Sequence, residues 1–379
     1  PAAPGSTLLE VQAAGRTTFA PITVVRTGVA TLLGALDLAG SAGDTAIAGD
    51  RVYVAAGVPG VHVVRVSNPR FPTLLSTLGI GTANDVDADA SNVLAVAAQP
   101  SGDIALFRLG TGPDGRAAAL TTTPLGSGVY YASVALAGDK AVATYGAKLA
   151  TIDASEDQAV VMGTTTVAEP VRSSVTTGSL AVAIGPRLVM TIDVSDPAAP
   201  TPLGTLEVNP TATSQIYESG GVAFRDGYAY VALGSTLLTV VDVTNPAAPV
   251  EVARFGQGDY YVADVAFVGD RLFGADFLRQ NAIAAVSHTS PTDLAYLGPI
   301  DFPGDFNGRG IDATDTLVAA IANDFNGGVA MQLQLASPTT PVFTLPDDAG
   351  ESTPPVASIL SPPALSEAYV GTSVAVTIM

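Results

Sequence analysis

One stretch of the chain carries the pattern that decides the fold: residues 237–254 read LLTVVDVTNPAAPVEVAR. An apolar segment rich in Val and Thr, typical of a β-strand, runs into Asn245-Pro246, and a short loop closed by Pro leads to a second apolar segment. The Asn-Pro step favours a turn, because the Asn side chain can hydrogen-bond to the turn backbone and the Pro ring fixes φ. The stretch therefore predicts two strands joined by a tight connection.

The same pattern occurs at 61–77 (VHVVRVSNPRFPTLLST) and at 188–205 (LVMTIDVSDPAAPTPLGT), with Asn68 and Asp196 before the Pro. A second pattern, strand, two-residue turn and strand, precedes each copy and is typical of a β-hairpin. The hairpin pattern recurs seven times, and we expect the second turn residue at positions 50, 91, 139, 178, 227, 270 and 315. Four short strands repeated about every 44 residues are the signature of propeller blades. The sequence predicts an all-β, seven-bladed propeller of four-stranded blades, with eight blades as the alternative.

Composition agrees with many short strands. The 379 residues include 39 Gly and 27 Pro, which suits frequent turns, and hydrophobic residues make up 47% against 13% charged, which is ample for a packed core. The net charge of −19 disfavours binding to nucleic acid, because an acidic surface repels phosphate groups. There is no Cys, which excludes disulfides and thiolate chemistry, and no apolar run reaches the length of a membrane span, so we expect no direct membrane insertion.

The two ends are expected to differ from the blades. Residues 22–38 look like the last two strands of a unit without its hairpin, so we expect 32–38 to close the ring by joining the final blade, and 1–345 to form the propeller. Residues 346–355 (PDDAGESTPP) are typical of a linker. Residues 356–379 resemble the opening strands of a bacterial immunoglobulin-like module that this chain contains only in part.

The repeat resembles a known family on particular residues. Val240-Val241-Asp242-Val243-Thr244-Asn245-Pro246 and Thr191-Ile192-Asp193-Val194-Ser195-Asp196-Pro197 are similar to the LVIVD repeat of bacterial and archaeal cell-surface propellers, and the resemblance extends over about 22–346. It implies a propeller fold and an extracellular, cell-surface location. It implies no reaction.

Repeat phase predicts a ring of charged residues at one mouth of the propeller channel. First strands of blades line the channel, and the residue that opens each first strand is expected to be Asp44, Asp85, Ser133, Arg172, Gly221, Asp264 or Arg309. Three acids and two arginines in one ring predict either a salt-bridged plug or a ligand site, and the plug is favoured because fixed opposite charges satisfy one another.

Two groups of residues have a weak resemblance to calcium ligands. Asp85, Asp87 and Asp89 alternate, which places three carboxylates on one face of a strand, and hard cations prefer oxygen ligands. Asp305 and Asn307 match the first and third positions of a calcium-binding loop, although Arg309 stands where an acid is usual. The bland interpretation, solvated acids in ordinary strands and turns, is favoured for both, so no cofactor is expected.

The sequence shows no convincing catalytic site. His62 and His288 are the two histidines, and neither lies in a pattern that would position an imidazole for catalysis. We therefore expect a non-catalytic adhesion, structural or interaction module of a large secreted protein, with protein, glycan or sister-subunit partners. The alternative is a propeller hydrolase with a metal-bound water at the channel mouth. Four or more acids without arginine at that mouth would favour the enzyme, and a mixed ring would favour the module.

Overall fold

The computed structural model describes two compact units, Leu32–Pro338 and residues 1–31 with 339–379. The residues whose structure it describes are 5–13, 16–24, 31–89, 92–111, 117–127, 132–155, 158–208, 220–232, 238–255, 262–276, 283–300, 306–324, 330–338 and 356–359. Every ordered element in these ranges is a β-strand, as the repeat pattern predicts. No helix among them is long and apolar enough to cross a membrane.

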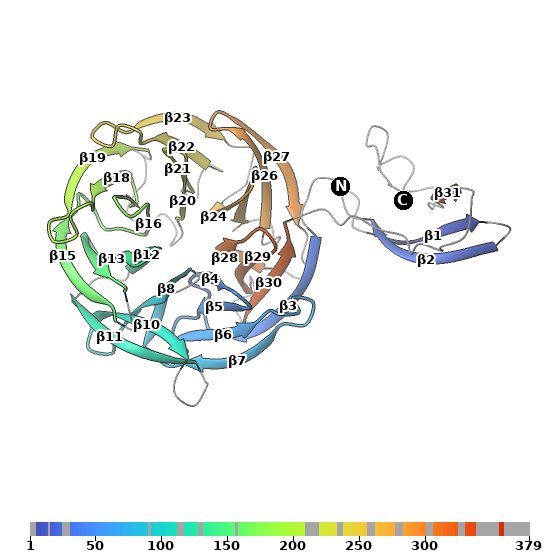
Figure 1. Ribbon diagram of the computed structural model, residues 1–379, viewed down its shortest axis with the longest axis horizontal. Helices are drawn as coiled ribbons and strands as arrows, with labels where there is room; N and C mark the ends of the chain where they lie inside the picture. The colour runs from blue at the N-terminus through green and yellow to red at the C-terminus, as the bar shows by residue number, and fades with distance from the viewer. Residues whose placement is uncertain are drawn as a thin grey trace. The chain divides into compact units, whose positions relative to one another are not determined.

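The larger unit is a β-propeller of seven four-stranded antiparallel sheets arranged in a ring about a central axis (Figure 1). The seven-bladed prediction is confirmed, and the eight-bladed alternative is wrong. From the inner to the outer strand, the first four blades are β4 (Thr45–Ala48), β5 (Arg51–Ala55), β6 (Val61–Arg65) and β7 (Thr73–Leu78); β8 (Thr82–Ala88), β9 (Val93–Ala98), β10 (Asp103–Thr111) and β11 (Ala117–Ser127); β12 (Ala132–Ala137), β13 (Lys140–Tyr145), β14 (Lys148–Asp153) and β15 (Val160–Thr166); β16 (Ser173–Thr176), β17 (Leu180–Ile184), β18 (Leu188–Asp193) and β19 (Thr201–Glu207). The remaining three are β20 (Val222–Arg225), β21 (Tyr228–Val231), β22 (Leu238–Asp242) and β23 (Val250–Phe255); β24 (Val262–Val268), β25 (Arg271–Asp276), β26 (Ile283–Ser290) and β27 (Asp293–Ile300); β28 (Phe306–Ala313), β29 (Val318–Asp324), β30 (Ala330–Ser337) and β3 (Thr31–Ala39).

The seventh blade joins the two ends of the propeller. Its three inner strands come from the end of the unit, and its outer strand, β3, comes from the beginning and is hydrogen-bonded to β30. The Gln332 side-chain amide also donates to Asp37 Oδ1 at 2.9 Å. Residues 32–38 thus lie where ring closure places them, but the strand begins at Thr31 and not at 22. Residues 22–24 belong to β2 instead, and 25–30 lie outside the described residues.

The smaller unit contains a three-stranded sheet in the order β2–β1–β31, built from β1 (Gly5–Ala13), β2 (Arg16–Val24) and β31 (Val356–Ile359). The expected propeller range of 1–345 is therefore too long at its start, because residues 5–24 pair with each other and with 356–359. The expected linker at 346–355 lies outside the described residues, as do 360–379. The immunoglobulin-like character of 356–379 stays a prediction.

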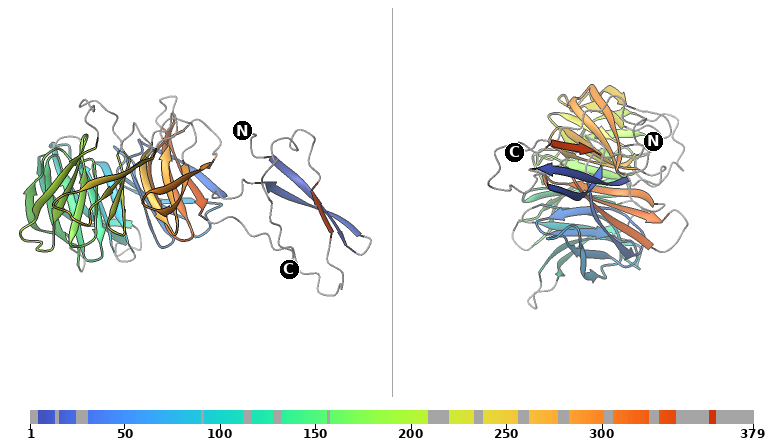
Figure 2. Two further views of the ribbon diagram at one scale, coloured as in Figure 1. Left: turned by 90° about the horizontal axis from the view of Figure 1, so that it is seen from above. Right: turned by 90° about the vertical axis from the view of Figure 1, so that its right-hand side faces the viewer.

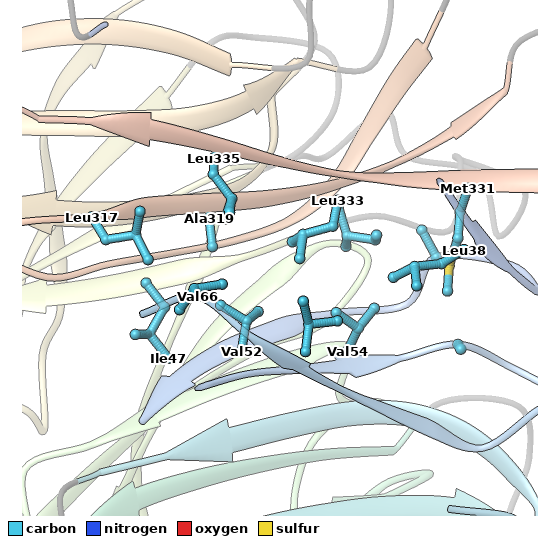
Figure 3. Packing of buried hydrophobic residues seen from close by; sticks show 14 residues of the cluster. Leu38, Ile47, Val52, Val54, Val66, Leu317, Ala319, Met331, Leu333 and Leu335 are labelled. Carbon is cyan, nitrogen blue, oxygen red and sulfur yellow. The ribbon is translucent and has the colours of Figure 1, made fainter. Parts of the chain in front are cut away.

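Apolar side chains from adjacent blades pack face to face and hold the ring together. Between the seventh and first blades, Leu333 and Leu335 of β30 pack with Val52 and Val54 of β5, and all four side chains are fully buried (Figure 3). The middle strands of each blade are covered on both faces, so they read as continuous apolar runs, whereas the outer strands alternate between exposed and half-buried residues. Burying each such Val or Leu stabilises the fold by about 1.5–3 kcal/mol. Figure 2 shows the same ring of sheets from the side.

The Asx-Pro turns also connect neighbouring blades. The Thr191 hydroxyl on β18 donates to the carbonyl of Pro246 in the next blade's turn at 2.5 Å, and Thr151 on β14 donates to the carbonyl of Pro197 in the same way. Beside these threonines, Gly163 and Gly204 leave room for the turn, because a Cβ at either position would stand 2.5–2.6 Å from the proline carbonyl oxygen. The repeat motif is therefore an inter-blade contact as well as a turn.

Candidate functional site

The channel of the propeller contains a cavity of about 830 Å³. Most of its lining comes from the inner strands and the residues that precede them. All five charged residues expected at one mouth line it: Asp44, Asp85, Arg172, Asp264 and Arg309. Asp87 and Asp312 line it as well, so five carboxyl groups and two guanidinium groups share one cavity.

Hairpin register shows which residues are equivalent from blade to blade. The pairs that close the hairpin turns include Ala48–Arg51, Ala137–Lys140 and Val268–Arg271. Counting back four residues from the first member of each pair gives one equivalent position in every blade, on the inner strand or directly before it, which we call the ring position. The ring positions are Asp44, Asp85, Ser133, Ser173, Gly221, Asp264 and Gly310.

The ring position predicted from the sequence is therefore wrong for Arg172 and Arg309, which lie one residue before it. In the fourth blade Thr177 pairs with Leu180, so the turn is Gly178–Ser179, and in the seventh Thr314 pairs with Leu317, so the turn is Asp315–Thr316. The expected turn residues 178 and 315 are each the first residue of the turn and not the second. Arg172 and Arg309 therefore stand one residue before the ring positions Ser173 and Gly310, although both still line the channel.

Three of the inner strands bulge directly before the ring position. The register shifts between Ala83 and Asp85, between Val262 and Asp264, and between Gly308 and Gly310. In each case one extra residue is accommodated, and in the seventh blade that residue is Arg309. A bulge re-aims the side chains on either side of it. The alternation of polar and apolar residues in the sequence gives no sign of this extra residue.

The ring aspartates clamp one blade to the next through the backbone. Asp85 Oδ1 accepts the N–H of Val86, its own neighbour, at 2.8 Å, and Asp85 Oδ2 accepts the N–H of Val134 on β12 at 2.9 Å. Asp264 repeats the arrangement with the N–H groups of Val265 at 2.8 Å and Ile311 at 3.0 Å. Each carboxyl group thus satisfies one backbone donor in its own blade and one in the following blade.

A second layer of aspartates, two residues further along the inner strand, does the same. Asp87 accepts the N–H groups of Ala88 and of Leu136 in the next blade, both at 2.7 Å. Asp312 accepts those of Ala313 and of Ile47, which joins the seventh blade to the first. The sequence does not predict Asp312, because the predicted placement of the hairpin turn in the seventh blade is one residue off. With the turn at Asp315–Thr316, Asp312 is equivalent to Asp87 of the second blade.

Asp44 departs from this arrangement. Its carboxyl group accepts a hydrogen bond from the backbone of Thr45, its own neighbour, but forms its second hydrogen bond with the side chain of Asp85. On its other side it lies directly against Gly310 of the seventh blade, where any Cβ would collide with Asp44 Oδ1. The first and second blades are thus joined here by two carboxyl groups.

Enclosure in the propeller raises the pKa of every one of these acids. Desolvation is the largest cause throughout, and it raises the pKa of Asp87 and of Asp264 to about 7 and that of Asp312 to about 6. The pKa of Asp44 rises well above its ordinary value through desolvation, then through the charge and hydrogen bond of Asp85. Backbone N–H donors counteract the rise of each pKa, because they favour the ionised form.

The weak calcium candidates do not form one group. Asp85 and Asp87 point into the channel as clamps, whereas Asp89 lies at the hairpin turn, where its Oδ1 accepts the N–H of Asn92 at 2.7 Å. Asn307 lies on β28, and Asp305 is outside the described residues. Within the described ranges, no three His, Asp or Glu side chains are close enough together to hold a metal ion.

The two histidines lie apart, in different blades. His62 is buried, with Nδ1 2.8 Å from Thr77 Oγ1 and Nε2 2.7 Å from the carbonyl oxygen of Ala39, so both ring nitrogens have partners. His288 Nε2 lies 2.5 Å from the hydroxyl of the buried Tyr230, within an edge-to-face cluster that includes Phe267. Desolvation, and then the charge of Arg225, lower the pKa of His288.

The fold and the channel together define a seven-bladed propeller whose inner strands are tied by half-buried carboxyl groups that line the channel. Two segments, residues 39–78 and 218–256, match the family model of the LVIVD repeat, and they hold the first and the fifth blade. The chain therefore carries LVIVD repeats in a propeller fold. No curated protein matches it.

Solved structures add the architecture alone. A chain in a crystal structure of the mitotic checkpoint complex resembles this one with a TM-score of 0.60 at 12% sequence identity, covering 84% of this chain and 98% of that chain. Because 1023 solved chains match, and because propellers serve unrelated functions, this likeness carries no function across.

Proposed function

We propose that this chain is a non-catalytic interaction module of a secreted, cell-surface protein, in which the propeller presents its surface to protein or glycan partners. The observation that carries the proposal is the use of the channel carboxyl groups. Asp85, Asp87, Asp264 and Asp312 each accept two backbone N–H groups, one from the next blade. Carboxyl groups with these hydrogen bonds connect neighbouring blades and so stabilise the ring.

The mixed charge of the channel supports the same function. The cavity is lined by two arginines as well as five acids, so it is not the all-acid site that a metal-assisted hydrolase would favour. The LVIVD match and the net charge of −19 agree with a surface protein that stays soluble and avoids nucleic acid. Adhesion, the extracellular location and the choice of protein or glycan partner belong to the proposal.

A binding screen on the whole chain tests the proposal. Purified protein would be applied to a glycan array and to immobilised extracellular proteins, with heat-unfolded protein as the control for non-specific adhesion. Saturable binding by the folded form alone is the expected result. A folded protein that binds nothing across both screens would contradict the interaction module.

The alternative function, a metal-assisted hydrolase, draws its support from the pKa values of Asp87 and Asp264, which lie near 7 as a general acid or base requires. Ester, phosphate and glycoside substrates would be assayed with and without added divalent cations. Turnover that disappears in Asp264→Asn, but persists in the exposed-turn variant Asp270→Asn, would replace the interaction module with this enzyme.

A further inference from the structure

The inner-strand clamps follow a rule that one pair of blades breaks. Wherever an aspartate accepts an N–H from the next blade, the equivalent position of that next blade carries no carboxyl group. These clamped pairs are Asp85 with Ser133, Asp87 with Ala135, Asp264 with Gly310 and Asp312 with Ala46. The N–H in the next blade is then free for the incoming carboxylate. Between the first and second blades, by contrast, Asp44 is followed by Asp85.

This succession leaves Asp44 without a backbone donor in the next blade. By the rule it would take the N–H of Val86, but Val86 already donates to Asp85 Oδ1. Asp44 therefore meets the carboxyl group of Asp85 itself. Two carboxyl groups can form a hydrogen bond only if one of them holds a proton. Asp85 accepts two N–H groups, which favours its ionised form, so Asp44 is the member that holds the proton.

The surroundings place further charges around this pair. The charged residues that line the cavity in the described part of the chain are Asp44 beside β4, Asp85 and Asp87 on β8, Asp264 on β24, Asp312 and Arg309 on β28, and Arg172 beside β16. The charge of Asp264 acts on Asp44 and raises its pKa further. From β28, the Asp44 carboxyl group is met by Gly310, which has no side chain to donate a hydrogen bond.

We propose that the Asp44–Asp85 pair is a proton-dependent joint between the first and second blades. With its proton, Asp44 donates to the Asp85 carboxylate and the two inner strands are joined. Without it, two like charges face each other in an enclosed channel, and the strands they belong to are pushed apart. The joint therefore tightens the propeller under acidic conditions and loosens it under alkaline conditions.

The direction in which stability changes with pH follows from proton binding. The pKa of Asp44 is raised in the folded protein, so the folded state binds a proton that the unfolded chain releases above its ordinary pKa of 3.8. The contribution of this proton to stability is complete below the ordinary pKa, and it is lost as the pH rises through the raised pKa of the folded state. Each proton held by the folded state alone changes the unfolding equilibrium constant about tenfold per pH unit.

The variant Asp44→Asn distinguishes the effect of this joint on stability from the effect of general repulsion among the acids. The Asn amide can donate to the Asp85 carboxylate without a proton, so the hydrogen bond remains at every pH. Urea unfolding would be measured at about pH 5 and about pH 8.5 for wild type, Asp44→Asn, Asp85→Asn and the exposed-turn control Asp50→Asn. In Asp44→Asn the unfolding equilibrium constant should change less with pH than in wild type, by up to about tenfold for each pH unit.

Asp85→Asn is expected to behave differently. Its amide nitrogen would replace one oxygen that now accepts from Val86 or Val134, so unfolding should become easier at both pH values. Asp50→Asn should follow wild type. If Asp44→Asn keeps the full pH dependence, or if Asp85→Asn removes it without loss of stability at low pH, the assignment of the proton to Asp44 is overturned.

An infrared measurement keeps the proposal testable even if the stabilities are masked by other groups. In protein labelled with ¹³C at the aspartate carboxyls, the carboxylic-acid carbonyl band at about pH 5, above the ordinary pKa of an exposed aspartate, should be weaker in Asp44→Asn than in wild type, because one protonated carboxyl group has been removed. The band should be unchanged in Asp50→Asn. A band equally strong in Asp44→Asn and in folded wild type would refute the shared proton.

Discussion

At the scale of single residues, two aspartates of the seventh blade show that position decides what a carboxyl group does. Asp312, on β28, accepts the N–H groups of Ala313 and Ile47 and thereby ties the last blade to the first. Asp315, three residues later, lies exposed in the hairpin turn. The two have the same chemistry, but one satisfies enclosed backbone donors and the other faces water.

Replacing these two residues should therefore give unequal effects. Asp312→Ala leaves the N–H groups of Ile47 and Ala313 without their acceptor, and we expect it to lower the free energy of unfolding by about 1–3 kcal/mol. Asp315→Ala should change it by less than about 0.5 kcal/mol. Urea unfolding at neutral pH measures both, and equal effects would show that the clamp adds nothing to the ring.

Another residue-scale prediction concerns His288, whose pKa is lowered by desolvation and then by the charge of Arg225. The Arg225 guanidinium lies over the Phe267 ring, 5.1 Å from its centroid, within the same cluster. Arg225→Gln removes that positive charge, so the pKa of His288 should rise towards its ordinary value. Titration of the His288 ring protons by NMR measures the shift, with Arg254→Gln, which lies outside the cluster, as the control. A pKa left unchanged by Arg225→Gln would mean that burial alone sets it.

At the scale of strands and turns, the Asx-Pro motif has a structural purpose that reaches beyond its own blade. The turn after β18 presents its Pro197 carbonyl to Thr151 and Gly163 of the preceding blade, and the turn after β22 presents Pro246 to Thr191 and Gly204. Outer strands of neighbouring blades are thus fixed through a carbonyl group, a hydroxyl group and a missing side chain.

A methyl group at Gly163 tests this contact. In Gly163→Ala the new Cβ would stand 2.5 Å from the Pro197 carbonyl oxygen and 2.7 Å from that of Ala198, so the turn must move and its bond to Thr151 is lost. We expect a lower midpoint of thermal unfolding. Gly79→Ala, which meets nothing within 4 Å, is the matched control and should be neutral or raise the midpoint slightly through lower chain entropy. A Gly163→Ala protein as stable as Gly79→Ala would show that the turn is not held there.

The sequence predicts these elements well and their exact phase less well. The Asx-Pro turns, the hairpins and the number of blades follow from residues such as Asn68 and Asp196, whose side chains accept turn N–H groups as expected. The predicted ring position is wrong in the fourth and seventh blades. The sequences Thr177-Gly178-Ser179 and Ala313-Thr314-Asp315 each allow two placements of the hairpin turn. A one-residue choice moves each side chain to the other face of a strand. The hydrogen-bond register of the strands decides between the two placements of the turn, and amino-acid composition does not.

At the scale of the whole molecule, the channel makes the propeller's stability depend on pH in an unusual direction. Five enclosed acids, Asp44, Asp85, Asp87, Asp264 and Asp312, have raised pKa values, so the folded state binds protons that the unfolded chain gives up. Their contribution to stability is complete below about 3.8 and is lost as the pH rises through their folded values, which are about 6 for Asp312 and about 7 for Asp87 and Asp264.

We therefore expect wild-type protein to be more stable at about pH 5 than at about pH 8. Two effects act in the opposite direction at lower pH. The lowered pKa of His288 removes stability as the pH falls below about 6.5, and the lowered pKa values of Asp153, Asp193 and Asp242 remove it below about 3.8. Urea midpoints across this range, compared at equal slope, measure the dependence. A midpoint that rises steadily from about pH 5 to pH 8 would contradict it.

The closure of the seventh blade by β3 also determines when the ring can be completed during folding. Six blades are made of strands that follow one another along the chain, so their contacts are local and can form soon after each segment is synthesised. The seventh must wait for β30, and its contact between Gln332 and Asp37 spans 295 residues. Contacts of such separation form slowly. Until they form, β30 remains an open strand edge, so the last step of folding is also the step at which a newly made chain is most exposed to pairing with another.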